Sequence, residues 1–129
     1  MRLLLDSHIL VAIALKRLSA VSAAAERLLQ QPGLEAKVSV ASLWEIAIKT
    51  RLGKLDPGLP LNGLAGYFEA AGFAVLPITA AHALIEIAPV PPTRDPFDRL
   101  LLAQCAVENL RLVTLDAALR DHPLAAKLV

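Results

Sequence analysis

Four acidic side chains stand at the ends of apolar segments, where they are candidates for metal-dependent chemistry. They are Asp6, Glu45, Asp98 and Asp116. Two carboxylates ~4 Å apart repel each other by about 4 kcal/mol at an effective dielectric constant near 20, so a cluster needs a proton, a basic partner or a cation. An all-oxygen set suits Mg²⁺ or Mn²⁺, and the sequence offers no His/Cys set that would suit zinc. The pattern therefore predicts a divalent-cation site, if the fold brings these groups together.

Asp98 belongs to the most informative stretch, Arg-Asp-Pro-Phe-Asp-Arg-Leu-Leu-Leu-Ala-Gln-Cys, which spans residues 94–105. Pro96 suits the first position of a helix and Asp95 suits its N-cap. Asp98 then falls in the first turn, on the same side as Asp95. A purely structural alternative is that both acids cap the helix, where the helix dipole favours negative charge.

The other acids also have structural alternatives. Asp6 and Asp116 each follow a short apolar run and are suitable N-caps. Glu45 is four residues before Lys49, an ion-pair spacing that stabilises a helix by a few tenths of a kcal/mol. These alternatives do not explain why all the acids fall at element ends on one side of the predicted sheet.

Short apolar runs alternate with helical patterns along the chain. The runs predict strands at 2–5, 37–40, 73–78 and 112–115, with a possible edge strand at 127–129. Helices are predicted after Asp6, from a cap at Ser19 or Ser22 to Gln31, over 43–52, at 61–71 and 80–87, and from Pro96, with a further helical turn capped by Asp116. The alternation predicts an α/β fold, one domain over residues 1–129, with a mostly parallel sheet of four to five short strands and helices on both faces. The active site of such a sheet lies outside the carboxyl ends of its strands.

The charge balance limits the ways in which the protein can bind nucleic acid. Thirteen basic and twelve acidic residues leave a net charge of +1, so no global field attracts RNA and any binding must be local. Candidate contacts to an RNA backbone are Arg94, Arg99, Lys49 and Arg51, with solvated surface charge as the alternative.

Compartment and redox state are also constrained. Met1 and Arg2 precede an apolar stretch, but Asp6 and His8 interrupt it and Lys16 follows it, which argues against a signal peptide. No apolar run approaches the ~18 residues that cross a bilayer. The single cysteine cannot form an internal disulfide. We expect a soluble cytoplasmic protein with no membrane contact, whose three histidines are structural.

Four blocks of this sequence resemble the PIN-domain ribonucleases, most closely the VapC-type toxins of bacterial toxin–antitoxin pairs. The blocks are Leu-Leu-Leu-Asp-Ser at 3–7, Ser-Leu-Trp-Glu-Ile-Ala-Ile-Lys at 42–49 with Gly-Lys-Leu at 53–55, Arg-Asp-Pro-Phe-Asp-Arg-Leu-Leu-Leu-Ala-Gln at 94–104, and Val-Thr-Leu-Asp at 113–116. Their order and spacing cover nearly the whole chain.

The resemblance implies Mg²⁺-dependent RNA cleavage by a homodimer that a small antitoxin inhibits. It carries the family's acids over to Asp6, Glu45, Asp98 and Asp116, with Asp6, Asp98 and Asp116 as metal ligands. Ser7 and Thr114 take the positions of the supporting hydroxyls. One departure is Thr93, which stands where similar sequences often place His.

The inhibitor expected from this resemblance is an amphipathic segment with one Arg or Lys that enters the acidic site. Four apolar side chains lie on helices expected to flank its groove: Trp44, Leu52, Tyr67 and Phe68.

Three other functions remain open. A PIN nuclease could process RNA without being a toxin. A phosphate-transfer enzyme of the haloacid-dehalogenase type needs a second Asp two residues after the first, and that position holds His8. A non-enzymatic binding module would leave the carboxylates as helix caps.

Overall fold

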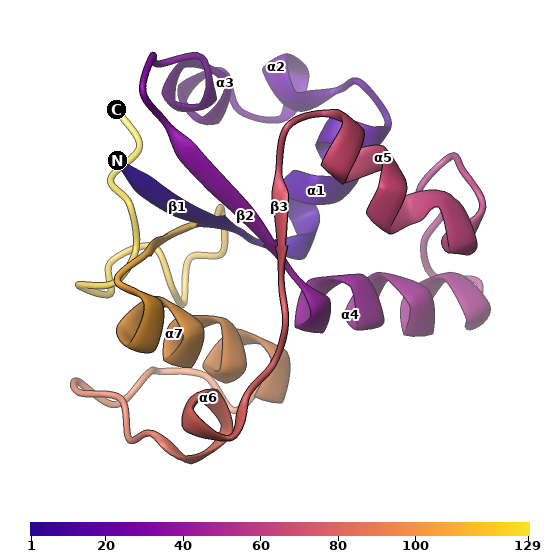
Figure 1. The fold of residues 1–129 in the computed structure, drawn as a ribbon. Helices are drawn as coiled ribbons and strands as arrows, with labels where there is room; N and C mark the ends of the chain where they lie inside the picture. The colour runs from indigo at the N-terminus through magenta and orange to yellow at the C-terminus, as the bar shows by residue number, and fades with distance from the viewer.

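A four-stranded parallel sheet forms the centre of the molecule, which the computed structural model describes over residues 1–129 (Figure 1). Its strands are β1 (Arg2–Leu5), β2 (Glu35–Ser39), β3 (Ala74–Leu76) and β4 (Arg111–Val113), in the order β3-β2-β1-β4. β1 lies between β2 and β4, with Leu4 opposite Lys37 on one side and Leu112 on the other. The prediction of a parallel α/β fold is confirmed.

Helices cover both faces of the sheet. The helices are α1 (Ser7–Ala14), α2 (Leu18–Val21), α3 (Ala23–Leu29), α4 (Val40–Arg51), α5 (Leu64–Ala70), α6 (Ala80–Leu84) and α7 (Pro96–Glu108). A short 3₁₀ turn, Leu61–Gly63, leads into α5.

Alternation along the strands produces two separate cores, because successive side chains of a strand point to opposite faces. Leu3 and Leu5 are buried with residues of α1, α3, α4 and α5, including Phe68. Leu4 is buried on the other face with Leu101, Cys105 and other residues of α7. Each strand of the centre is thus covered on both sides, as its continuous apolar sequence requires.

Side-chain hydrogen bonds set two element boundaries earlier than the sequence pattern predicts. Ser39 ends β2 and caps α4, since its Oγ accepts from the Ala41 N–H at 3.0 Å. Thr114 ends β4, and its Oγ1 accepts from the Asp116 N–H at 3.1 Å. The β-branched residue Val40 therefore begins a helix, where the sequence predicts the end of a strand.

The predicted edge strand at 127–129 is wrong. The C-terminal segment makes one isolated parallel bridge to the sheet, between Leu112 and Ala125. Its backbone pairing is short because a turn from Asp116 to Ala125 keeps the chain from running along β4; the His122 carbonyl accepts from the Ala125 N–H at 2.9 Å. No helix of the structure is long and apolar enough to cross a membrane.

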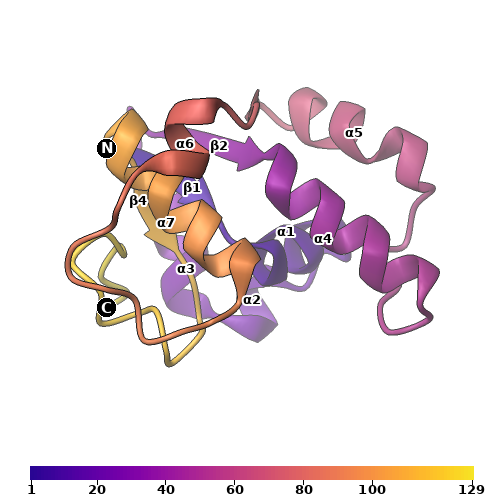
Figure 2. The same ribbon diagram turned by 90° about the horizontal axis from the view of Figure 1, so that it is seen from below.

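Three elements bring their ends to the carboxyl edge of β1. The start of α1 follows β1 directly, while the first half of α4 and the N-terminal end of α7 pack beside it (Figure 2). Asp6, Glu45 and Asp98 belong to these three elements.

Candidate active site

Asp6 is the buried centre of a hydrogen-bonded network. It occupies the N-cap position of α1, but its carboxylate accepts no N–H from that helix. Its Oδ2 instead accepts from Thr114 Oγ1 at 2.6 Å, and its Oδ1 accepts from Ser7 Oγ at 3.2 Å. The capping alternative is therefore wrong for Asp6, whose position is held by the two predicted hydroxyls.

Glu45 joins this network from α4. Ser7 Oγ also lies 2.8 Å from Glu45 Oε1, so one hydroxyl stands between two buried carboxylates. Lys49 Nζ donates to Glu45 Oε2 at 2.7 Å, which confirms the predicted i,i+4 pair. That hydrogen bond raises the pKa of Lys49 and keeps the ammonium charged beside the acids.

Asp98 enters from the first turn of α7. Asp95 alone caps this helix, with its Oδ1 accepting from the Phe97 N–H at 2.8 Å and from the Asp98 N–H at 3.4 Å. The Asp98 carboxylate accepts only from Thr93 Oγ1, at 3.3 Å. It is therefore not one half of a capping pair, and it turns toward the other acids.

The Asp98 carboxyl is buried within reach of the negative charge of other acids. Burial raises the pKa of Asp98 to about 6, and the negative charges of four further acids add to the effect. These acids are Asp95, Asp6, Asp116 and Glu45, in order of decreasing contribution. Three elements and one turn thus bring excess negative charge to one edge of the sheet.

Asp116 is the acid with the strongest structural role of its own. Its Oδ1 accepts from the Ala118 N–H at 2.8 Å, so the predicted helical turn after β4 is present and Asp116 stabilises it. Thr114 connects this turn to Asp6, because the same hydroxyl that donates to Asp6 accepts from the Asp116 N–H.

The carboxylate oxygens are the right type of ligand for a hard divalent cation, but in this structure they are not close enough together to coordinate one. Carboxylate oxygens in excess over nearby cations are what Mg²⁺ or Mn²⁺ binds best. No three His, Cys, Asp or Glu side chains, however, converge closely enough in this structure to hold a metal ion. The expectation of a preassembled cluster of Asp6, Asp98 and Asp116 is therefore not met, and their role as ligands stays a prediction.

The four predicted RNA contacts differ in their surroundings. Lys49 is paired with Glu45, and Arg99 Nε donates to the Thr93 carbonyl at 2.7 Å, next to a hollow between α6 and α7. Arg94 and Arg51 are exposed and form no ion pair. Of the four residues, only Arg94 and Arg51 have a charged group without a protein partner.

Sequence reasoning missed two basic residues beside the acids, His8 and Lys54. His8 was expected to be structural, but its side chain is 72% exposed and its Nδ1 lies 4.0 Å from Asp6 Oδ1. Lys54 lines a hollow together with Ser7, Glu45 and Lys49. A sequence signal for Lys54 was available: it directly follows Gly53, where α4 was predicted to end, and a chain that turns there stays beside the last turn of the helix.

Residues 3–123 match the model of one protein family, the PIN domain. No curated protein matches the chain.

Proposed function

This chain belongs to the PIN-domain family, whose members are generally nucleases, and on that basis we propose that it is a metal-dependent endoribonuclease. The observation that carries the proposal is a pair of buried acids, Asp6 and Glu45, which both contact the Ser7 hydroxyl, while Asp6 also accepts from Thr114 Oγ1. This pair lies at the carboxyl edge of a parallel sheet, where open α/β sheets place their ligands. Burying two carboxylates side by side costs stability, and such a cost is typical of functional sites.

In the proposed reaction, Asp6, Asp98 and Asp116 would hold Mg²⁺ or Mn²⁺. A bound ion would lower the pKa of a water and offset charge on the scissile phosphate. Thr114 fixes the orientation of the Asp6 carboxylate by donating to Oδ2, and the Ser7 hydroxyl lies between Asp6 Oδ1 and Glu45 Oε1, so that its one hydrogen is shared between the two acids. The protein thus supplies a rigid Asp6, while Asp98, with one weak hydrogen bond, keeps the freedom to adjust.

Glu45 and Asp98 are the two candidates for accepting the proton of the attacking water. They differ in their hydrogen bonds. Both oxygens of Glu45 have partners, one the Ser7 hydroxyl and one the Lys49 ammonium, whereas the Asp98 carboxylate accepts only from Thr93 Oγ1.

The test is cleavage of a labelled single-stranded RNA by purified protein with Mg²⁺, Mn²⁺ or a chelator. We expect cleavage with either metal and none with the chelator. A DNA strand of the same sequence tests the preference for RNA, and Asp121→Asn, at an exposed acid of the C-terminal segment, is a matched control that should cleave like the parent. Absence of cleavage with both metals across several RNA sequences would contradict the proposal.

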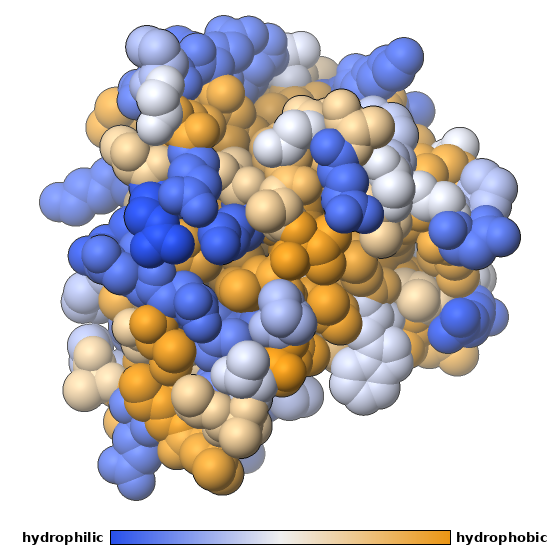
Figure 3. Space-filling view, viewed as in Figure 1, coloured by the Kyte–Doolittle hydropathy of each residue, from blue (hydrophilic) through white to orange (hydrophobic).

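We further propose that the protein is the toxin of a toxin–antitoxin pair and acts as a homodimer. Exposed apolar side chains near the acidic edge support a protein partner: Trp44 is 58% exposed and Leu52 is 63% exposed. The Trp44 ring meets Phe97 edge-to-face at 5.6 Å, so this surface joins α4 to α7. Figure 3 shows hydrophobic surface over β3 and the start of α4. Phe68, by contrast, is fully buried in the core and does not line a groove.

A small antitoxin with an amphipathic segment would cover this surface and place one basic residue among the acids. We expect expression of the protein alone to arrest growth, and co-expression with the product of an adjacent small gene to restore it. Relief should require an Arg or Lys in the C-terminal half of that product. Normal growth with active protein would favour an RNA-processing nuclease instead, and the mass of the purified protein in solution tests the homodimer.

A further inference from the structure

The two hydroxyls that hold Asp6 line two different hollows. Ser7, which donates to Asp6 Oδ1, lines a hollow of about 300 Å³ between α1 and α4. Thr114, which donates to Oδ2, lines a hollow of about 630 Å³ formed by the C-terminal segment. Asp6 therefore lies between them. A substrate that reaches this carboxylate can extend into either space.

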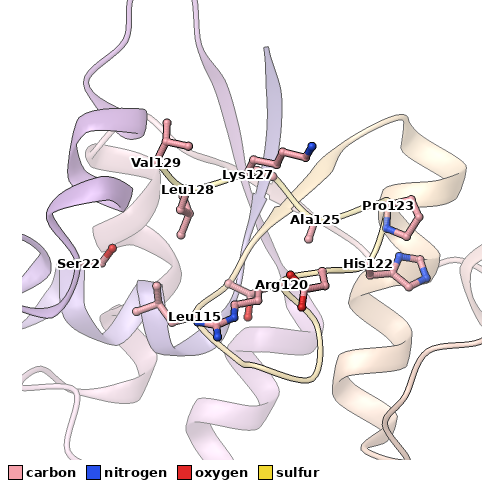
Figure 4. A pocket seen from close by; sticks show the side chains of 12 residues that line it. Ser22, Leu115, Arg120, His122, Pro123, Ala125, Lys127, Leu128 and Val129 are labelled. Carbon is pink, nitrogen blue, oxygen red and sulfur yellow. The ribbon is translucent and has the colours of Figure 1, made fainter.

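The C-terminal hollow carries mixed charge. Figure 4 shows Arg120 beside Leu115, while Lys127 lies farther along the C-terminal segment. Asp121 belongs to the same lining, so the acid offsets part of the positive charge. Formal charge therefore does not distinguish this hollow from the one between α1 and α4; what distinguishes the latter is that two residues of the acidic site, Ser7 and Glu45, line it.

The hollow between α1 and α4 contains one lysine, Lys54, that has no protein partner. Lys49 and Glu45 neutralise each other at 2.7 Å. Lys54 lines the same space and forms neither an ion pair nor a hydrogen bond through its ammonium group, and His8 adds an exposed ring. Apolar side chains complete the wall: Val11, Ile46 and Leu55.

We propose that this hollow binds the nucleotide of the RNA that adjoins the cleaved bond, with Lys54 contacting its phosphate. The inference rests on the proposed function, and it names a substrate contact for the same site. A lysine that lacks a protein partner can exchange water and counterions for a phosphate, whereas Lys49 would first have to leave Glu45. The apolar wall suits the sugar and base of one nucleotide, and a volume of about 300 Å³ is at the lower end for small-molecule sites.

The test compares one cation from each hollow. Binding of a labelled oligoribonucleotide is measured by fluorescence anisotropy with a chelator present, so that no cleavage occurs, over a range of salt concentrations. Lys54→Gln should weaken binding several-fold at low salt and reduce the slope of log K against log salt by about 0.7, the value for one contact to a single strand. Arg120→Gln should leave both quantities near those of the parent, and Lys54→Arg should restore binding. Parental binding by Lys54→Gln, or an equal loss in both Gln variants, would overturn the inference.

Oligonucleotide length provides a second readout. Removing the nucleotide on one side of the cleaved bond should abolish the difference in binding affinity between the parent and Lys54→Gln. Removing the nucleotide on the other side should preserve that difference. If the difference persists with both shortened RNAs, Lys54 acts through a general field and the hollow is not the site. Metal-dependent cleavage by the parent is measured in parallel. If the parent cleaves RNA and Lys54→Gln binds RNA normally, only this inference is refuted. If the parent never cleaves RNA, the proposed function is refuted.

Discussion

Two buried polar clusters lie at different places in this fold, and they differ in how their hydrogen bonds and charges balance. One is the acidic edge around Asp6. The other joins β2, α6 and α7 through Ser39, Gln104, His82 and Glu108. There Ser39 Oγ donates to Gln104 Oε1, and Gln104 Nε2 donates to the Pro77 carbonyl at 3.3 Å.

The second cluster is satisfied by its own members. His82 Nδ1 accepts from the Thr79 N–H at 3.0 Å and also completes the cap of α6, while His82 Nε2 lies 2.7 Å from Glu108 Oε2. One ring thus ties two helices together, as expected for a structural histidine. At the acidic edge, by contrast, Lys49 pairs with Glu45 while Asp98 has no cationic partner, and burial together with the charges of the neighbouring acids raises the pKa of Asp98 to about 6. Complete internal pairing indicates a structural cluster, and unmatched charge indicates one that needs a ligand.

The largest expected effect is a loss of RNA cleavage on mutating the acidic edge, with no matching loss on mutating the second cluster. Asp6→Asn removes one negative charge but little volume, so RNA cleavage should fall by roughly 100-fold or more while the protein stays folded. Cleavage rates and circular dichroism check this. Cleavage by Asp6→Asn at the rate of the parent would remove Asp6 from the active site.

The satisfied cluster should respond in stability rather than in activity. Gln104→Leu leaves Ser39 Oγ and the Pro77 carbonyl without their partner, and it should reduce the free energy of unfolding by about 1–3 kcal/mol. Urea unfolding measures the loss. The folded fraction should still cleave RNA, and a large activity loss in fully folded Gln104→Leu would show that the two clusters are coupled. Glu108→Gln, which can keep a hydrogen bond to His82, is the milder control.

A third experiment uses pH to detect the unmatched charge. Because the pKa of Asp98 is raised from 3.8 to about 6 by folding, the folded state favours the protonated acid. The stability that this preference provides is complete below the unfolded pKa and is lost as pH rises through about 6. Without metal, Asp98→Asn should therefore be more stable than the parent at pH 7.5, by roughly 1–3 kcal/mol. Near pH 3.5 the difference should disappear. A variant less stable than the parent at pH 7.5 would mean that Asp98 is a structural hydrogen-bonding group.

The smallest expected effect is stabilisation by a cation. At a free Mg²⁺ or Mn²⁺ concentration of about ten times the dissociation constant, binding to the folded state alone adds about 1.4 kcal/mol. The melting temperature of the parent should rise accordingly, and Asp6→Asn should lose the response. Asp121→Asn should retain it. An unchanged melting temperature of the parent with both metals would contradict a cation site at the acidic edge.

The sequence alone predicted the four strands and most of the helices in order, because apolar runs, Pro96 and Gly53 are local signals. It predicted one helix where the structure has two, α2 and α3. Local signals also predicted the Glu45–Lys49 pair and the helix that carries Asp98. The edge strand predicted at 127–129 is wrong, because an apolar C-terminal segment can join a sheet only if the preceding turn places it alongside a strand.

Local sequence also determined that Asp6 and Asp116 each follow a strand, and it left open whether these carboxylates cap helices or face one another. Only the tertiary structure decided that question. Thr114 is 108 residues from Asp6 in the chain, yet the pairing of β1 with β4 places its hydroxyl 2.6 Å from the Asp6 carboxylate. The packing of α1 against α4 likewise places His8 and Lys54 in the hollow that Ser7 and Glu45 line, a shared neighbourhood that no local sequence signal predicts.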